Sequence, residues 1–514
     1  MYDIFYMKQI DLKDLGNFIK SLRESRNLTQ TELAVMLNTS QPVIARIERG
    51  EQNMTTQTLN GLSVALNKPI VQIATKSIDV EINGGKELKG TIQTNTSKNG
   101  AMGLLCAALL NYGSTTLHGV PRIEEVNRIL EVMSSIGVRV KWLSENTLLI
   151  DRPKRLQLEN INYESASRTR TILMFIGVLI HDFEECQLPH SQGCTLGTRT
   201  ITPHLNGLKK FGVDIKVTEN SYDIYSPLTD LDSYPDVNIT MTEASDTGAE
   251  LLLIAAAKYS GLTTIKFAPS NYMVQEVCFF LQDLGVEIEG VGTHILKVKG
   301  LKDIRKTIEY FNSEDPIESM MFFSLAVCTK SELTITRCPI DFLEIEIEKM
   351  KEMGVQFTIS DVYKSDNKRT NLADVIVHKT TKLVALPDKI SCGPYPALNI
   401  DNLPFFVPIC ALAEGRSLIL DWVYEVRVTH FLKLADLGAD MQLANPHCLY
   451  INGQKKFKPG QVTCPPALRP AMIVLIAMLS AQGNSKLYNL YSIYRGYENI
   501  IMRLQTLGAD IKFI

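Results

Sequence analysis

The apolar residues near the start of the chain follow the period of short helices. Between residues 12 and 26 they fall three or four positions apart, which predicts a first helix with one apolar face. Thr29 and Glu32 then have the spacing of a capping box, in which each side chain bonds the other residue's backbone N–H. This pair predicts that a second helix begins directly after Thr29. The apolar positions of the first helix are Leu12, Leu15, Phe18, Ile19 and Leu22.

Two further helices complete this opening segment. Residues 38–40 predict a turn, and the helical pattern of residues 41–49 ends at Gly50, the residue type preferred just past a helix end. Residues 57–66 predict a fourth helix. We therefore expect residues 1–75 to form a small all-α domain.

From Ile78 onward a different pattern recurs six times. It reads apolar residue, glycine, Val or Ala, any residue, apolar residue, and the spacings between copies are 75, 73, 69, 84 and 70 residues. Each glycine follows a helical pattern and precedes a short alternating strand, so it marks the passage from helix to strand. Such regular recurrence indicates repeated structural modules. The six glycines are Gly137, Gly212, Gly285, Gly354, Gly438 and Gly508.

An Ala- and Leu-rich helix precedes most copies, followed by a turn of small residues and another strand. Each module is therefore expected to run strand, helix, strand, helix, strand, strand. Six such modules bury their apolar helices together only if the helices cluster centrally and the sheets lie outside. The predicted fold class is α/β, with six βαβαββ modules after the small all-α domain.

Composition narrows the class of protein. Hydrophobic residues make up 45% and charged residues 21% of the 514 residues, with a net charge of -3, which is typical of a soluble globular protein and excludes a general polyanion binder. The ten cysteines include no CxxC and no Cys/His cluster, so neither structural zinc nor a disulfide scaffold is expected. We expect no metal, no cofactor, no membrane span and a cytoplasmic location.

One loop, within residues 188–208, holds a candidate reactive group. Cys194 lies between Gly193 and Gly197, with Arg199 five residues further on. A nearby positive charge favours the thiolate, the reactive form of cysteine. The alternative is an ordinary cysteine that packs as a small apolar side chain.

Residues 8–75 strongly resemble the Cro/C1-type helix-turn-helix family. In that family the second helix of the motif lies in the major groove of DNA. The resemblance implies that Gln41 and Arg46 read base edges and that Gln30 contacts phosphate. Residues 1–75 carry eight Lys/Arg against seven Asp/Glu, so a module retained for protein contacts stays an alternative. Domains of this type often bind DNA as dimers, which gives a homodimer as the expected assembly.

The six modules and several motifs resemble the enolpyruvyltransferases. The resemblance implies two inverse α/β-barrel-like domains of three modules each, residues 99–311 and residues 78–98 plus 312–514. Its motifs include Ser97–Ala101, the Cys194 loop, EDPIES from Glu314, NIDNLPFF around Asp401, and IYRGYE around Arg495.

The resemblance also implies roles for individual residues. Phosphoenolpyruvate carries a phosphate and a carboxylate, so its site needs cations, which Lys98, Arg199, Arg427 and Arg495 supply. Cys194 is the candidate acid that protonates the vinyl carbon, and in the family it is the target of the epoxide antibiotic fosfomycin. Asp401 is the candidate base for the acceptor hydroxyl. Further expected substrate contacts are Asn99, Arg170, Thr202, His204, Asp246, Asp315 and Val423.

Several positions depart from the pattern of the family members that act on UDP-N-acetylglucosamine. Thr202 replaces an aspartate, while Ala244 and Asp246 replace a lysine and a serine. Met273, Pro316, Ile400 and Ala467 also differ. Three functions therefore stay open: transfer from phosphoenolpyruvate to the 3'-hydroxyl of UDP-N-acetylglucosamine, transfer to another nucleotide or sugar, and a transcription regulator whose enzyme-like part senses such a ligand.

Overall fold

The computed structural model describes residues 12–26, 28–37, 39–52, 54, 56–66, 78–191, 200–229 and 234–514. The chain divides into two compact units, residues 1–79 and residues 80–514. We call the first the N-terminal unit and the second the body. Each has a hydrophobic core of its own.

The N-terminal unit contains the four predicted helices, α1 (Leu12–Ser25), α2 (Gln30–Met36), α3 (Gln41–Glu48) and α4 (Thr56–Ala65). The capping box between Thr29 and Glu32 is confirmed, with both reciprocal hydrogen bonds present. Gly50 has a φ of +73°, and a Cβ atom there would lie 2.6 Å from the backbone of Lys13. Glycine is therefore required where α3 ends.

The six repeated glycines of the body all have a left-handed backbone, with φ between +82° and +100°. Each follows a helical segment and precedes a strand, as predicted. The strands that follow them are β4 (Arg139–Trp142), β7 (Asp214–Val217), β11 (Glu287–Glu289), β15 (Phe357–Ile359), β20 (Asp440–Asn445) and β24 (Asp510–Phe513).

Six apolar helices form the centre of the body. In α12, for example, every residue from Pro316 to Cys328 is buried, because helices α14 and α16 and strands of the neighbouring sheet pack against it. The six are α5 (Lys98–Ala108), α8 (Ile172–Leu179), α10 (Asp246–Ala257), α12 (Pro316–Cys328), α14 (Leu403–Leu412) and α16 (Leu468–Ser480). More amphipathic or shorter helices are α6 (Glu124–Ser135), α7 (Tyr163–Ser167), α9 (Thr202–Leu208), α11 (Tyr272–Asp283), α13 (Glu344–Glu352), α15 (Arg427–Phe431), α17 (Tyr491–Tyr494) and α18 (Ile500–Thr506).

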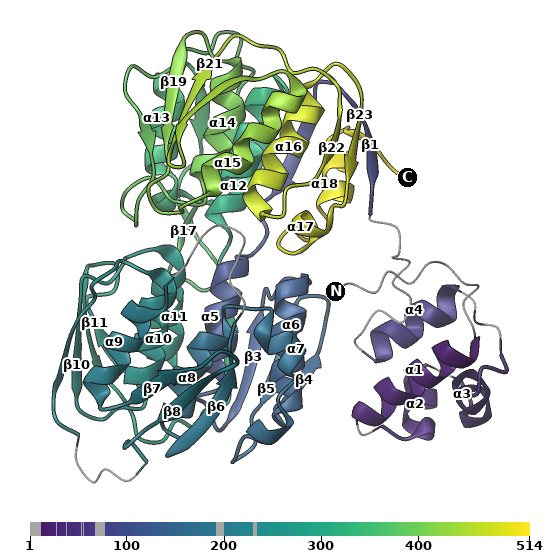
Figure 1. Ribbon diagram of the computed structural model, residues 1–514, viewed down its shortest axis with the longest axis vertical. Helices are drawn as coiled ribbons and strands as arrows, with labels where there is room; N and C mark the ends of the chain where they lie inside the picture. Colours follow the sequence, from purple (N-terminus) through teal and green to yellow (C-terminus); the bar gives the residue numbers. More distant parts are fainter. Residues whose placement is uncertain are drawn as a thin grey trace. The chain divides into compact units, whose positions relative to one another are not determined.

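We call residues 99–311 lobe 1 and residues 78–98 with 312–514 lobe 2. Lobe 1 has three sheets, ordered β13-β3-β5-β4, β6-β8-β7 and β11-β12-β10-β9. Their remaining strands are β3 (Ser114–His118), β5 (Thr147–Asp151), β6 (Glu185–Pro189), β8 (Ser221–Tyr225), β9 (Val237–Thr240), β10 (Leu262–Lys266), β12 (Ile295–Lys299) and β13 (Ile308–Phe311). In Figure 1, helices α8 and α10 lie between β10 on one side of this lobe and β3 and β5 on the other.

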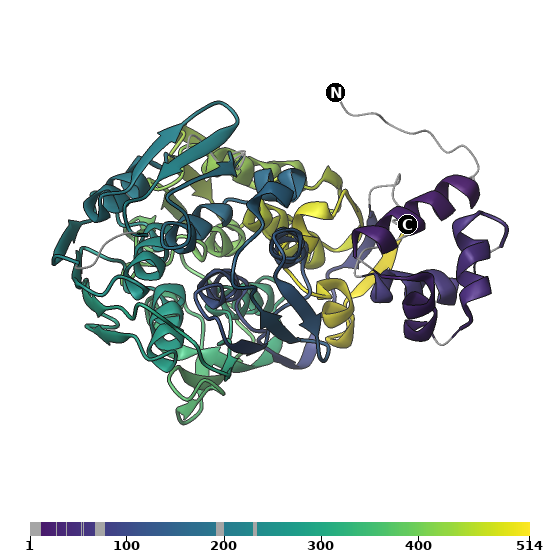
Figure 2. The ribbon, with the colours of Figure 1, turned by 90° about the horizontal axis from the view of Figure 1, so that it is seen from below.

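Lobe 2 also has three sheets, ordered β22-β23-β1-β24, β15-β17-β14-β2 and β18-β19-β21-β20, with β16 paired to β17. Strand β1 pairs with β24, so the beginning and the end of the body share one sheet, and Figures 1 and 2 both show these strands side by side. The remaining strands are β1 (Val80–Gly84), β2 (Lys89–Gln93), β14 (Glu332–Pro339), β16 (Tyr363–Lys364), β17 (Asn371–Val377), β18 (Ile390–Ser391), β19 (Arg416–Leu420), β21 (Cys448–Asn452), β22 (Gln461–Thr463) and β23 (Gly483–Tyr488).

One module departs from the common plan. In the described part of the chain, the sheet β6-β8-β7 has three strands, all antiparallel. Each of the other sheets also contains one pair of parallel strands. The segment before α7 contains Pro153, which has no N–H to donate to a neighbouring strand. The predicted α/β fold with a small helical domain is otherwise confirmed.

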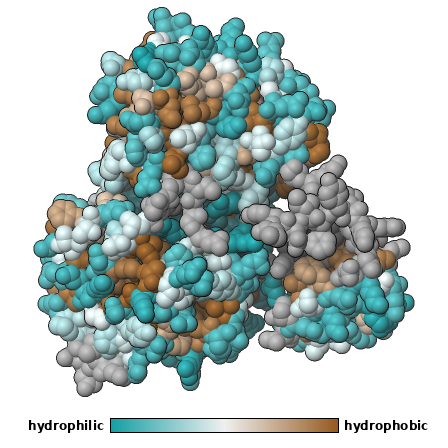
Figure 3. Space-filling view, viewed as in Figure 1, coloured by the Kyte–Doolittle hydropathy of each residue, from teal (hydrophilic) through white to brown (hydrophobic). Residues whose placement is uncertain are grey.

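Hydrophilic residues predominate on the face of the body seen in Figure 3. Figure 3 shows hydrophilic residues spread over both lobes on the viewed face, with smaller apolar areas between them. Among the described residues, no helix has the length and apolar character needed to cross a membrane.

Candidate functional site

The chain passes between the two lobes at two segments that run side by side. Strand β2 of lobe 2 leads into α5 of lobe 1, and strand β13 of lobe 1 leads into α12 of lobe 2. Thr96 and Glu314 form an antiparallel bridge where these segments meet. Lys98 begins α5 and Asp315 caps α12. The double crossing therefore places two predicted site residues at the boundary between the lobes.

Lys98 and Arg495, both predicted to bind anions, meet on a single carboxylate. Glu125 of α6 accepts a hydrogen bond from Lys98 Nζ, and its other oxygen accepts one from Arg495 Nη2 at 2.7 Å. Burial alone would raise the pKa of Glu125, but the charges of Lys98 and Arg495 outweigh burial and lower that pKa to about 2. Glu125 belongs to lobe 1, Arg495 to lobe 2, and Lys98 is the last residue of lobe 2 before the first crossing, so this cluster of opposite charges joins the lobes.

Asp401, the predicted base, lies between two guanidinium groups of lobe 2. Its two oxygens are 3.4 Å from Arg427 Nη1 and 3.5 Å from Arg469 Nη2. Arg427 is fully buried and also pairs with the buried carboxylate of Asp421, at 2.5 Å. Arg469 donates a hydrogen bond to the hydroxyl of Tyr497. These pairings fix both arginines beside Asp401.

A third group joins the amino ends of α5, α11 and α12. Asn99 donates a hydrogen bond to the hydroxyl of Tyr272, at 3.1 Å. Asp315 accepts a hydrogen bond from the backbone N–H of Ile317, and burial raises the pKa of Asp315 to about 6. The pKa of Tyr272 is raised well above its usual value, first by burial and then by the charge of Asp315. Tyr272 thus contacts the predicted residue Asn99 and is close to Asp315.

The lobe 1 residues predicted to contact substrate also gather in one place. Arg170 Nη2 donates to the backbone oxygen of Thr200, at 3.0 Å, just before α9 begins at Thr202. His204, buried in α9, shares a 3.0 Å hydrogen bond with the hydroxyl of Thr247. Thr247 directly follows Asp246, so the beginnings of α9 and α10 are neighbours.

Three predicted residues remain. Cys194 and Arg199 lie outside the described residues. Val423 is half-buried, and its backbone N–H donates to Asp421, at 3.3 Å. Through Asp421 it is connected to Arg427.

The sequence did not single out Glu125, Tyr272 or Asp421. Glu125 is one of two glutamates in the first turn of α6, where acidic residues are common because they suit the helix dipole. Tyr272 and Asp421 belong to stretches with no distinctive motif. No sequence signal separates these three from ordinary residues.

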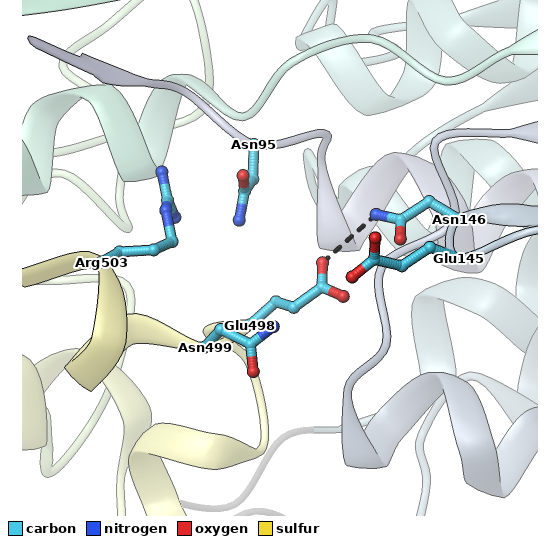
Figure 4. A pocket seen from close by; sticks show the side chains of 6 residues that line it. All are labelled: Asn95, Glu145, Asn146, Glu498, Asn499 and Arg503. Atoms are coloured by element: carbon cyan, nitrogen blue, oxygen red, sulfur yellow. Dashed lines mark hydrogen bonds between the residues drawn. The ribbon is translucent and has the colours of Figure 1, made fainter. Parts of the chain in front are cut away.

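A polar pocket of about 360 Å³ lies further along the same boundary. Its walls come from both lobes, and Figure 4 shows Asn146 of lobe 1 and Glu498 of lobe 2 facing one another with a hydrogen bond between them. Burial raises the pKa of Glu498. The lining residues are Asn95, Glu145, Asn146, Glu498, Asn499 and Arg503.

In the N-terminal unit, two of the three predicted DNA contacts belong to one hydrogen-bonded chain. Gln41 donates to Gln30 at 2.6 Å, and Gln30 donates to Glu48 at 2.8 Å. Glu48 is buried and pairs with Arg23, at 2.5 Å. Arg46 is exposed on the same helix, α3. The buried ion pair therefore anchors the side chain at the start of the predicted recognition helix.

Comparisons with known proteins identify a family for each of the two units. A family model described as EPSP synthase (3-phosphoshikimate 1-carboxyvinyltransferase) matches residues 82–504, and one described as helix-turn-helix matches residues 19–73. The chain therefore belongs to the enolpyruvyltransferase family, a family of transferases, and carries an N-terminal helix-turn-helix domain. Both resemblances drawn from the sequence are confirmed.

The relatives come from several bacteria. A UDP-N-acetylglucosamine 1-carboxyvinyltransferase of Streptococcus pneumoniae serotype 2 is 31% identical over 435 residues, which cover 85% of this chain and 99% of the relative. The protein of the same name from Campylobacter hominis is 28% identical over 434 residues, covering 84% and 98%. Among solved structures, the enolpyruvyl transferase NikO from Streptomyces tendae shares the fold with a TM-score of 0.72 and 21% identity, covering 85% of this chain and 99% of its own.

Proposed function

We propose that the body transfers the enolpyruvyl group of phosphoenolpyruvate to the 3'-hydroxyl of UDP-N-acetylglucosamine, as the names of its relatives suggest, or to a hydroxyl of another nucleotide or sugar. The first of these reactions would begin the synthesis of peptidoglycan precursors. The observation that carries the proposal is the meeting of Lys98 and Arg495 on Glu125. Two cations that meet at the boundary between the lobes form a site suited to a small, doubly charged anion.

In the proposed reaction, Cys194 donates a proton to C3 of phosphoenolpyruvate while the acceptor oxygen bonds to C2. Asp401 takes the proton that leaves the acceptor hydroxyl. The product of this addition is a tetrahedral intermediate that still carries phosphate on C2. When the Cys194 thiolate takes a proton back from C3, the C2–C3 double bond forms again, the bond from C2 to the phosphate oxygen breaks, and inorganic phosphate leaves. Lys98 and Arg495 stabilise the charge on the departing phosphate.

A phosphate-release assay with phosphoenolpyruvate and a panel of UDP-sugars, nucleotides and free sugars tests this proposal. We expect release with at least one acceptor, and Cys194→Ser to reduce turnover by roughly 100-fold or more, the range of general acid catalysis. The same substitution should remove inhibition by fosfomycin. Cys448→Ser is the matched control, because Cys448 is a free and only partly buried cysteine. Unchanged activity in the Cys194 variant would refute the assignment.

We also propose that the helix-turn-helix domain binds DNA through α3. The support is the chain from Gln41 through Gln30 to the buried Arg23–Glu48 pair, which presents Gln41 in a fixed position. A gel-shift assay against genomic fragments tests it. We expect Gln41→Ala to weaken binding to a preferred fragment by about 1 to 3 kcal/mol, and Lys20→Ala on α1 to have a smaller effect that is the same for all fragments.

Only unspecific, salt-sensitive binding in this assay would count against DNA recognition. Specific binding to one fragment, combined with no phosphate release from any acceptor, would instead favour a transcription regulator whose body binds these ligands without reaction.

A further inference from the structure

The amino end of α10 carries a negative charge of its own. Asp246 is the first residue of this helix, directly after the capping residue Ser245, whose hydroxyl accepts a hydrogen bond from the N–H of Gly248. The amino end of a helix is partly positive and commonly attracts phosphate or another anion. Here the carboxylate of Asp246 already occupies that favourable position, so a second anion would meet a like charge.

Neighbouring groups hold Asp246 in place. Asn271 is buried at the start of α11, and its Nδ2 donates to Asp246 Oδ2 at 3.0 Å. The side-chain oxygen of Asn271 in turn accepts a hydrogen bond from the backbone N–H of Tyr272, at 2.9 Å. Asp246 Oδ1, by contrast, is shielded from solvent and has no hydrogen-bond partner in the described part of the chain. A buried oxygen of this kind favours a ligand that donates a hydrogen bond to it.

Among the described residues, the groups that act on Asp246 include no positive charge. Burial raises its pKa to about 6, Asn271 acts in the opposite direction, and Asp401 raises the pKa further. One turn further along α10, Glu250 is 1% exposed, and burial together with Asp246 raises its pKa well above the usual value. With its pKa at about 6, Asp246 is mostly charged at pH 7. Asp401, the proposed base, is thus close enough for its charge to act on Asp246. Asn271, which holds Asp246, directly precedes Tyr272, and the Tyr272 hydroxyl accepts a hydrogen bond from the predicted substrate residue Asn99.

We propose that Asp246 selects the acceptor substrate. Its carboxylate accepts a hydrogen bond from a hydroxyl or amino group of a sugar or nucleoside that places no phosphate at the start of α10. The inference rests on the proposed function, because the acceptor hydroxyl must reach Asp401 and its neighbouring groups then lie against the start of α10. It goes further by naming the chemistry of the acceptor. A nucleoside diphosphate sugar is disfavoured by like-charge repulsion.

Isothermal titration calorimetry with UDP-N-acetylglucosamine tests the inference on the full-length chain. Asp246→Asn keeps the shape and an acceptor oxygen but removes the charge, so we expect it to bind UDP-N-acetylglucosamine about tenfold more tightly than the unsubstituted chain. The gain should shrink as salt is raised. Binding of N-acetylglucosamine alone should not improve. Asp246→Ser provides a second variant, and thermal unfolding checks that both are folded.

Glu243→Gln is the matched control, because Glu243 is an exposed carboxylate in the same loop, three residues before Asp246. It should leave the affinity for UDP-N-acetylglucosamine unchanged. Equal or weaker binding by both Asp246 variants, including no binding by any form, would overturn the inference.

The binding readout separates this inference from the proposed function. If the proposed transfer is wrong, no acceptor yields phosphate, yet Asp246→Asn still gains affinity for UDP-N-acetylglucosamine. If only the inference is wrong, the unsubstituted chain releases phosphate with UDP-N-acetylglucosamine, and Asp246→Asn leaves its KM unchanged.

Discussion

Glu125 acts as an internal anion for the two cations that are proposed to bind phosphoenolpyruvate. The ion pairs with Lys98 and Arg495 keep both cations at the boundary between the lobes. A substrate phosphate at this point must share these cations with Glu125 or replace it. Glu125 therefore lowers the net positive charge that an incoming anion meets.

Replacing Glu125 with glutamine should therefore strengthen the binding of inorganic phosphate. We expect a gain in affinity of about five- to tenfold, because one opposing charge is removed while a hydrogen-bonding side chain of the same shape remains. Titration calorimetry with phosphate measures this directly. Glu124→Gln is the control, since the neighbouring Glu124 pairs with Arg128 instead. Weaker phosphate binding in the Glu125 variant would show that this carboxylate chiefly positions the cations.

For single residues, the sequence predicted which side chains belong to the site better than it predicted which residues they contact. Lys98 and Arg495 were expected to bind anions, and they do meet. Their common partner Glu125 was not expected, because a glutamate in the first turn of a helix is ordinary. Residues far apart in the chain meet only after the whole fold has formed, and no local pattern records such contacts.

Among the elements, the turn between β16 and β17 has a specific role in joining the lobes. Asn367, in this turn of lobe 2, donates a hydrogen bond to Glu276 of α11 in lobe 1, at 3.3 Å. Arg369, in the same turn, pairs with Asp283 at the other end of α11. The backbone N–H of Ser313, in the second crossing segment, also donates to Glu276, at 3.1 Å. Glu276 thus connects three segments of the body.

The stability of the body should depend on pH through Glu276. Burial raises the pKa of Glu276 from 4.5 to about 7, against hydrogen bonds from Ser313, Asn367 and Tyr310, while the charge of Glu314 raises it further. The folded state therefore binds this proton more tightly than the unfolded state does. The contribution of Glu276 to stability is complete below pH 4.5 and is lost as pH rises towards 7.

Glu276→Gln resembles the protonated form at every pH. We expect its free energy of unfolding to exceed that of the unsubstituted chain increasingly between pH 5 and pH 7, by about 2 to 3 kcal/mol at the upper end. Denaturant unfolding at several pH values measures the difference. Glu287→Gln, at an exposed position of β11, should show no such trend. A difference that does not change with pH would contradict the role given to Glu276.

The sequence predicted the helices and strands themselves well, because the six glycines mark real left-handed helix ends. It did not predict which strands join which sheet. Strand β13 of lobe 1 pairs in parallel with β3, and β2 of lobe 2 pairs in parallel with β14. Strands β13 and β2 are each followed by a helix of the other lobe. This exchange depends on long-range pairing, which a local pattern does not contain.

For the whole molecule, the separate cores predict that the body works without the N-terminal unit. Deleting residues 1–77 removes no residue of the body's core and no strand of its sheets. We expect kcat and KM for phosphoenolpyruvate to stay within about twofold, as for domains that fold independently, and DNA binding to disappear. Steady-state kinetics and gel-shift assays on the full and shortened chains measure both effects. A folded but inactive body would mean that residues 1–77 contribute to catalysis.

The pairing of β1 with β24 has a consequence for the fusion of the body with other domains. Val80 lies opposite Phe513 on neighbouring strands, so the first and last residues of the body's sheets are adjacent. A coding segment attached upstream or downstream of the body would therefore emerge at the same end of two neighbouring strands of one sheet. The body is thus a favourable partner for gene fusion at either end, and for circular permutation through a short linker that joins these two strands.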